Sequence, residues 1–223
     1  RLAFRTVDLT DLVDVARALT SVPTATPIQI VAHFANTYAA DPAAAPLAAD
    51  HPAWRVKVEG AVNLHLVIAT MPTVKRFLLM SSMARVTGAH LQATYCGAND
   101  ALRCLGAARV RAGLPATVVD LPAIATFGTL GRWSGLPEVL LMRSRGIDLV
   151  DYRVTGRAIM DVLGDGRPGG PAGGQAVTVL VASTMDDEMA RAALFADAPQ
   201  GGRPDELAPA VGVPDLPSLS QAL

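Results

Sequence analysis

Short apolar runs alternate with longer amphipathic segments along the chain, and this alternation is the feature that most restricts its possible folds. The run Ile28-Gln-Ile-Val-Ala32 is rich in β-branched residues and suits a buried parallel strand. Apolar residues then recur at helical spacing over 54–71, and a second apolar run follows at 77–80. A helical stretch at about 92–112 and a run at 117–121 repeat the pattern. The alternation predicts βαβ units around a parallel sheet, which places the chain in the α/β class.

Further elements are expected on both sides of this pattern. The run 2–7 is interpreted as a short strand, and Thr10 as the cap of a helix that follows it. Toward the other end, a helix is expected at about 155–163 and a final strand at 176–181. A Gly/Pro-rich linker at 164–174 separates the two.

Glycine and proline also mark two longer segments without regular structure. Residues 123–146 combine several glycines with bulky aromatic side chains, a composition that suits a lid over the C-terminal ends of the strands. We expect residues 1–185 to form one catalytic domain that includes this lid. The Pro/Gly-rich residues 186–223 are expected to form a tail or linker.

The composition argues against several classes of protein. With 51% hydrophobic and 17% charged residues among 223, the chain can bury a sizeable core. A net charge of −1 gives no electrostatic footprint for nucleic acid, and no apolar run approaches the ~18 to 20 residues of a membrane span. Cys96 and Cys104 lie too far apart along one helix for an easy disulfide, which fits a cytoplasmic location. The four histidines lack metal-ligand spacing, so no metal is expected.

Polar residues that suit a reductase follow the run at 77–80. Ser82 ends this strand, and Tyr95 and Asn99 stand one turn apart on the next helix, so all three face the crevice where ligands bind in α/β sheets. Reduction of a ketone requires a proton for its oxygen, which a tyrosine can supply when an ammonium such as that of Lys57 stabilises tyrosinate. A serine hydroxyl can bond the oxygen where charge develops. Taken singly, Tyr95 is explained more simply as a packing residue, Ser82 as a cap and Lys57 as a solvated surface residue. Only their combination favours a catalytic site.

Several stretches carry more specific motifs. Phe77-Leu-Leu-Met-Ser-Ser-Met-Ala-Arg-Val-Thr-Gly88 leads to Gln92-Ala-Thr-Tyr-Cys-Gly-Ala-Asn99, a strand ending in Ser-Ser before Gln-x-x-Tyr-x-x-x-Asn. Lys57-Val-Glu-Gly-Ala-Val-Asn-Leu-His65 and Gly113-Leu-Pro-Ala-Thr117 flank this region. Together they resemble the ketoreductase domains of type I polyketide synthases, most closely the fungal highly reducing ones. The resemblance covers about residues 1–185 and implies a Rossmann-like parallel sheet of the short-chain dehydrogenase/reductase type.

The resemblance implies a reaction and a role for each polar residue. The domain would reduce a β-ketoacyl group on the phosphopantetheine of an acyl carrier protein with hydride from NADPH, among the other domains of a multidomain synthase. Tyr95 would be the proton donor and Ser82 would orient the β-keto oxygen, while Lys57 and Asn99 complete the tetrad. The contacts implied for NADPH are at Asp8 and Leu9 for adenine, at Ala35 and Asn36 along the cofactor, and at Pro122 and Ala123 near nicotinamide.

Two departures from the family pattern leave a second hypothesis open. Asn36 replaces a glycine, so a side chain there can crowd the cofactor. No strand, Gly-rich turn and helix that would hold a pyrophosphate precede Leu2, and the Gly-rich stretch at 128–135 belongs to the expected lid. We therefore expect a piece of a longer polypeptide that lacks the first βαβ unit and binds NADPH weakly by itself. The alternative to an enzyme is a catalytically silent, reductase-like domain of a synthase, although an intact tetrad favours the enzyme.

Overall fold

The computed structural model describes residues 3–37, 50–89, 91–125, 137–144, 147, 149–164 and 178–180. Part of the predicted lid, including 126–136, and the whole predicted tail, 186–223, lie outside the described residues. The same holds for most of the predicted linker at 164–174.

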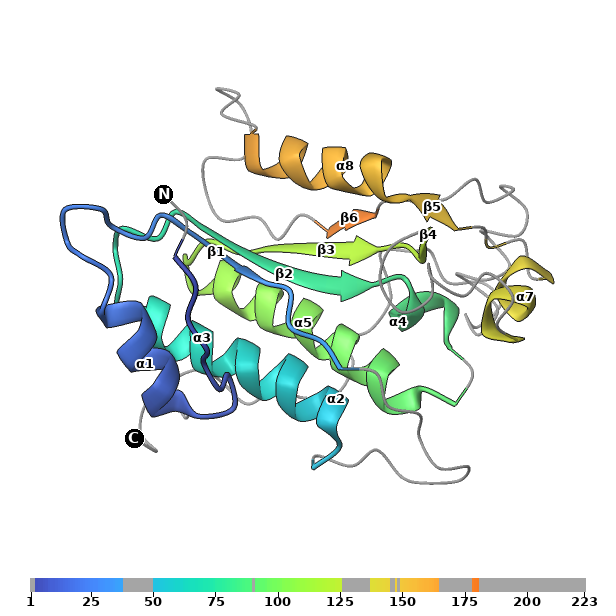
Figure 1. Cartoon of the computed structure of the whole chain (residues 1–223), viewed down its shortest axis with the longest axis horizontal. Helices are drawn as coiled ribbons and strands as arrows, with labels where there is room; N and C mark the ends of the chain where they lie inside the picture. Colours follow the sequence, from blue (N-terminus) through green and yellow to red (C-terminus); the bar gives the residue numbers. More distant parts are fainter. Residues whose placement is uncertain are drawn as a thin grey trace.

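Four parallel strands form the main sheet, in the order β1-β2-β3-β6 (Figure 1). Their bounds are β1 (Ile30–His33), β2 (Arg76–Ser82), β3 (Thr117–Leu121) and β6 (Thr178–Leu180). Each strand coincides with one of the predicted apolar runs, because these runs are the segments that can be buried on both faces of a sheet. The predicted α/β class with a parallel sheet is confirmed.

Two predictions for the first residues are wrong. Residues 3–7 form no strand, and the side chain of Val7 packs against the core without any strand pairing. Helix α1 (Leu12–Thr20) is capped by Asp11, whose carboxylate accepts hydrogen bonds from the second and third backbone N–H groups of the helix. Thr10 was the predicted cap, but its N–H and hydroxyl both donate to the preceding aspartate in a tight turn. Both residues are good helix caps, and the sequence did not distinguish them.

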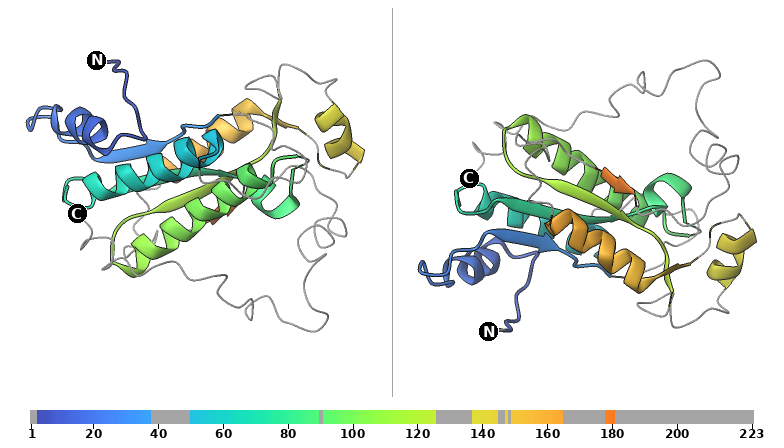
Figure 2. Two further views of the ribbon diagram at one scale, coloured as in Figure 1. Left: turned by 90° about the horizontal axis from the view of Figure 1, so that it is seen from below. Right: turned by 90° about the horizontal axis from the view of Figure 1, so that it is seen from above.

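The helices lie on both faces of the sheet (Figure 2). The helix predicted over 54–71 is a succession of α2 (Pro52–Trp54), the π-helical turn η1 (Arg55–Glu59) and α3 (Gly60–Ile68). The remaining elements are α4 (Ala84–Thr87), α5 (Ala93–Arg111), β4 (Ile124–Ala125), α7 (Pro137–Ser144), β5 (Val150–Asp151) and α8 (Tyr152–Gly164). Strands β4 and β5 pair in parallel as a separate small sheet, which the sequence did not predict. Helix α7 lies within the segment expected to be a lid.

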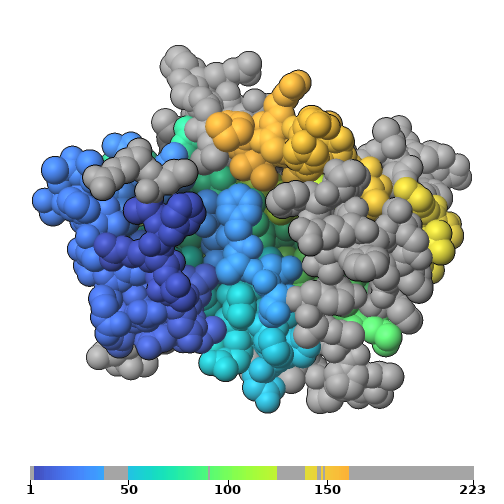
Figure 3. All heavy atoms as spheres, viewed as in Figure 1, coloured from blue at the N-terminus to red at the C-terminus, as the bar shows by residue number. Residues whose placement is uncertain are grey.

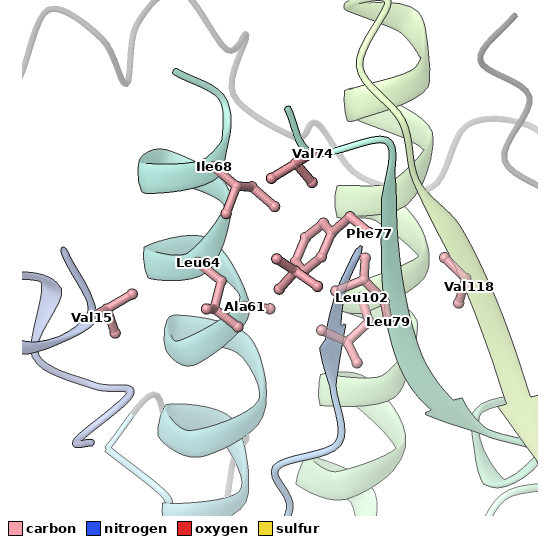
Figure 4. Packing of buried hydrophobic residues seen from close by; sticks show 10 residues of the cluster. Val15, Ala61, Leu64, Ile68, Val74, Phe77, Leu79, Leu102 and Val118 are labelled. Atoms are coloured by element: carbon pink, nitrogen blue, oxygen red, sulfur yellow. The ribbon is translucent and has the colours of Figure 1, made fainter. Parts of the chain in front are cut away.

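The main core lies between the sheet and helices α1, α3 and α5 (Figure 4). Its buried members are Val15, Val31, Ala61, Leu64, Ile68, Val74, Phe77, Leu79, Leu102 and Val118. Successive residues of β2 point to opposite faces, so Leu78 and Met80 pack instead with Val119 and the half-buried Ala158 and Ile159 of α8. The two layers of helix therefore fix β2 and β3 from both sides, with burial of each large side chain contributing about 1.5–3 kcal/mol.

Strand β1 is less enclosed than its neighbours. Val31 and His33 are buried, whereas Ile30 and Ala32 on the other face are exposed, and Phe34 just beyond the strand is 54% exposed. Figure 3 shows the surface on this side, with segments around β1 visible between α1 and α8. Within the described residues β1 pairs with β2 alone.

A search of the described residues finds no helix that is long and apolar enough to cross a membrane. It also finds no group of three or more His, Cys, Asp or Glu side chains that could hold a metal ion in this part of the chain.

Candidate active site

The candidate residues gather at one edge of the sheet because parallel strands end together. Strand β2 ends at Ser82, which pairs in register with Leu121 at the end of β3 (Figure 1). Strand β1 ends at His33, level with Leu79 of β2. In open α/β sheets the crevice outside these carboxyl ends is where ligands bind.

Lys57 connects the helical layer to this edge of the sheet. It belongs to the π-helical turn η1, a local widening of the helix that is frequent at functional sites. Its side chain is only 3% exposed, and its Nζ donates a hydrogen bond of 2.8 Å to the carbonyl oxygen of Met80. The same Nζ lies 5.8 Å from the centroid of the Tyr95 ring. Burial lowers the pKa of Lys57 to about 8, so the amine is still mostly protonated at neutral pH.

His33 supports the turn that carries Lys57. Its Nε2 lies 2.9 Å from the backbone carbonyl oxygen of Lys57. Burial lowers the pKa of His33 to about 4, so the ring is neutral at pH 7. Because a carbonyl oxygen only accepts, the hydrogen of the neutral ring is on Nε2. Sequence reasoning did not predict that His33 holds η1, and the sequence offers no signal for this contact.

Asn99 is fully buried on α5, one turn after Tyr95. Its Nδ2 donates to the backbone carbonyl of Tyr95 at 2.7 Å, and its own backbone carbonyl accepts from the Ser81 hydroxyl at 3.1 Å. Its Oδ1 is buried and has no hydrogen-bond partner within the described part of the chain. A buried acceptor without a partner is rare in native proteins. This atom therefore fits a donor group of a bound molecule or a water.

Ser82 and Tyr95 are half-buried and face the edge from β2 and α5. The Ser82 Oγ accepts a hydrogen bond of 3.1 Å from the backbone N–H of Ala84, which leaves its hydroxyl hydrogen available to an acceptor. Among the described residues, no hydrogen bond joins the Ser82 hydroxyl to the Tyr95 hydroxyl. The structure thus brings Lys57 and Asn99 directly to Tyr95, whereas Ser82 reaches the same edge through β2.

The predicted adenine contact is a well-defined turn. Leu9 is tied to α3 by a hydrogen bond of 2.8 Å from Asn63 Nδ2 to its carbonyl oxygen. A Cβ on Gly60 would lie 3.1 Å from Leu9 Cβ and 3.5 Å from His33 Cε1, so the turn lies beside the end of β1 and this helix requires glycine to approach it. Hydrogen bonds from the hydroxyl and N–H of the following threonine lower the pKa of the Asp8 carboxyl, which stays ionised.

The other predicted cofactor residues follow the strand ends. Ala35 is half-buried and Asn36 exposed just after β1. Pro122 is buried and Ala123 half-buried just after β3, where the Ala123 carbonyl accepts a hydrogen bond of 2.8 Å from the N–H of Val150. All four positions border the edge that holds Lys57, and their contacts with a cofactor stay predictions.

The sheet and the placement of its ligand-binding edge define a Rossmann-like protein of the short-chain dehydrogenase/reductase type. Residues 1–126, more than half of the chain, match the family model described as KR domain. The chain therefore belongs to the ketoreductase (KR) domain family of polyketide synthases.

Curated relatives agree with this assignment. The chain is 39% identical over 84 residues to the phthioceranic/hydroxyphthioceranic acid synthase of Mycobacterium bovis, which covers 38% of this chain and 4% of that protein. It is 36% identical over 86 residues to the highly reducing polyketide synthase tstA of Talaromyces stipitatus, covering 39% of this chain and 3% of that protein. The chain thus matches a small part of each of these proteins.

Solved structures share the fold. A structure of A-type ketoreductases from modular polyketide synthase superposes with a TM-score of 0.70 at 24% identity, covering 100% of this chain and 42% of that chain. The crystal structure of a blue fluorescent protein from a metagenomic library in complex with NADPH gives a TM-score of 0.62 at 17% identity, covering 79% of this chain and 72% of that chain. At these identities the likeness shows the fold alone.

Proposed function

We propose that the chain is the catalytic part of a ketoreductase that reduces a β-ketoacyl thioester to the β-hydroxyacyl form during polyketide synthesis. The acyl group would be carried by an acyl carrier protein of a cytoplasmic multidomain synthase. Residues 1–185 would be the reductase domain, with a lid at 123–146 and a linker at 186–223. The observation that carries the proposal is the buried ammonium of Lys57 beside the Tyr95 ring at the ligand-binding edge of a ketoreductase-family fold.

Proton transfer would be carried out by Tyr95. Its hydroxyl donates to the substrate oxygen, and the tyrosinate that remains is stabilised by the Lys57 ammonium next to the ring. Burial disfavours the charge on Lys57, as its lowered pKa indicates, so an anion formed nearby relieves this cost. Asn99 fixes the helical turn of Tyr95 through its bond to the Tyr95 carbonyl.

Ser82 would hold the same substrate oxygen. Its Oγ already accepts a hydrogen bond from the N–H of Ala84, so its hydroxyl hydrogen is available to donate to a substrate carbonyl. A carbonyl oxygen placed between Ser82 and Tyr95 would receive two hydrogen bonds as negative charge develops on it.

NADPH, when bound, would supply the hydride to the carbonyl carbon. The residues that would hold it are Asp8, Leu9, Ala35, Asn36, Pro122 and Ala123. They fit such a group because they follow the carboxyl ends of β1 and β3 or belong to the turn beside β1, and this edge of a parallel sheet is where ligands bind. The NADPH complex of a protein with the same fold supports this choice of cofactor.

The test is the substitution Tyr95→Phe in the complete protein that contains these residues. It keeps the ring beside Lys57 and removes the hydroxyl, so turnover of a soluble acetoacetyl thioester should fall ~10²- to 10⁴-fold while the thermal unfolding midpoint stays near that of the wild type. Loss of NADPH absorbance measures turnover. Tyr152→Phe makes the same chemical change on α8, where Arg153 stacks over the ring at 4.7 Å, and should leave the rate unchanged.

Two results would count against the proposal. Equal rates in the wild type and Tyr95→Phe would rule out Tyr95 as the proton donor. A folded wild-type protein that consumes no NADPH with the thioester would favour the catalytically silent, reductase-like domain instead.

A further inference from the structure

Arg85, which lies shortly after the candidate serine in the sequence, binds the fully buried carboxylate of Asp120. Arg85 lies on α4, three residues after Ser82, and its guanidinium reaches Asp120 on β3. Its Nε lies 3.0 and 2.9 Å from the two carboxylate oxygens, and its Nη2 lies 2.6 Å from Oδ2. The side chain of Arg85 is 16% exposed and that of Asp120 is 0% exposed. Such a two-pronged, desolvated pair has a single favoured geometry.

This pair fixes the position of the turn that follows β2. The turn is held at one point by the backbone N–H of Met83, which donates to the carbonyl of Leu121 at 3.0 Å. The bond from Arg85 to Asp120, the residue before Leu121, adds a second attachment to the same strand. Between these attachments lies the N–H of Ala84, which donates to Ser82 Oγ.

The same guanidinium also approaches α5. Its Nη1 lies 3.9 Å from Oδ1 of Asp100, the residue after Asn99, and Arg103 holds that carboxylate at 2.7 Å. Arg85 therefore stands between β3 and the helix that carries Tyr95 and Asn99. Arg85 thus contacts both β3 and α5 from a position three residues after Ser82.

We propose that Arg85 is a positioning residue, which holds the turn after β2 on Asp120 and so keeps the Ser82 hydroxyl aimed at the substrate oxygen. The inference rests on the proposed function, because it concerns the orientation of Ser82 in that reaction. It acts through the N–H of Ala84: while α4 stays in place, this N–H occupies an acceptor site of Ser82 Oγ, and the hydroxyl hydrogen is left for the substrate. If the turn rotates, the hydroxyl loses this orientation.

The test is a double-mutant cycle between Arg85→Lys and Ser82→Ala in the complete protein, with NADPH and a soluble acetoacetyl thioester. Lysine keeps the charge opposite Asp120 but lacks the planar fork. Since a misplacement of about 1 Å can cost ~10²-fold in rate, we expect Arg85→Lys to lower kcat ~10- to 100-fold, with KM for NADPH unchanged. In the Ser82→Ala background the same change should lower kcat less than about 2-fold, because the hydroxyl it orients is gone.

Arg103→Lys is the matched control. It makes the same substitution at the other arginine that binds Asp100, which lies on α5 and not in the turn after β2, and it should leave kcat at the wild-type value. If Arg85→Lys does not fold, Asp120→Asn takes its place, both in the wild type and in Ser82→Ala. This substitution keeps the side-chain volume and removes the charge that Arg85 binds.

The outcomes separate the two proposals. If the wild type is active and the fall in kcat of the double variant equals the product of the falls caused by Arg85→Lys and Ser82→Ala alone, the role of Arg85 is overturned and the proposed function stays intact. An equal fall in kcat for Arg103→Lys would do the same, because it would show that exchanging either arginine bound to Asp100 disturbs the site without acting through the turn after β2. A folded wild type without turnover would overturn the proposed function and this inference with it.

Discussion

Two buried cations lie against β2, and they differ in the aromatic ring beside them. Arg109 is 1% exposed and its guanidinium stacks 4.9 Å from the centroid of Phe77 near the start of the strand. Lys57 is 3% exposed and lies 5.8 Å from the centroid of Tyr95 near the end of the strand. Phenylalanine has no proton to lose, whereas the half-buried tyrosine has one and can be reached from solvent.

The partners of the two cations differ as well. Arg109 donates through Nε to the carbonyl of Pro115 at 3.2 Å and through Nη1 to Nδ1 of His65, so several partners surround it. Lys57 donates to the Met80 carbonyl, and an ammonium has three donors. Burial of a cation by itself therefore does not define a site. What favours one is a cation beside a group that can ionise.

Exchange of Lys57, the cation proposed to serve catalysis, should give the largest effect. Lys57→Met removes the ammonium that would stabilise tyrosinate, so turnover of the thioester should fall ~10²- to 10⁴-fold. Its free energy of unfolding at pH 7 should be unchanged or higher, because a desolvated charge is replaced by an apolar chain of similar length. Activity assays and urea denaturation of the same preparations measure the two quantities. A variant that keeps its activity would remove the distinction drawn between the two cations.

Exchange of Arg109 should have the opposite result, with lower stability and an unchanged kcat. Arg109→Met leaves the Pro115 carbonyl and His65 Nδ1 without their donor and removes the stack on Phe77, which should lower the free energy of unfolding by about 2–4 kcal/mol. The value of kcat at a temperature where the variant is folded should stay near that of the wild type. A large fall in kcat with unchanged stability would show that Arg109 also serves the reaction.

The sequence predicted the main sheet because its strands are apolar runs that suit a parallel sheet, although β1 turned out to be exposed on one face. It wrongly predicted a strand over 2–7: residues 3–7 form none, and Val7 packs on the core without a partner strand. It also chose Thr10 over Asp11 as a helix cap, since both residue types cap well.

For the candidate site, the sequence indicated that Tyr95 and Asn99 share a helix face, which the hydrogen bond between them agrees with. It could not show that Lys57 binds the Met80 carbonyl from a π-helical turn, because this contact depends on how helix and strand pack. The pairing of Arg85 with Asp120 was missed, although a carboxylate inside an apolar strand is a signal that a cation lies opposite. The contact of Arg109 with His65 has no such signal.

The smallest expected effect concerns acid and the environment of Arg109. Burial and the charge of Arg109 lower the pKa of His65 to about 4, so its ring is neutral when folded at pH 5.5 but takes up a proton when unfolded, where its pKa is near 6.5. The unfolded state then binds more protons, so stability falls as the pH drops from about 6.5 toward 4. His33, beside Lys57, has a pKa of about 4 for the same main reason and contributes similarly. His65→Asn keeps an acceptor for Arg109 but cannot titrate, so its loss of stability between pH 7 and pH 5.5 should be smaller than that of the wild type by roughly 1 kcal/mol. Urea denaturation at the two pH values measures this difference. Equal losses in both proteins would mean that folding does not lower the pKa of His65, so that burial and the charge of Arg109 do not act on its ring as inferred.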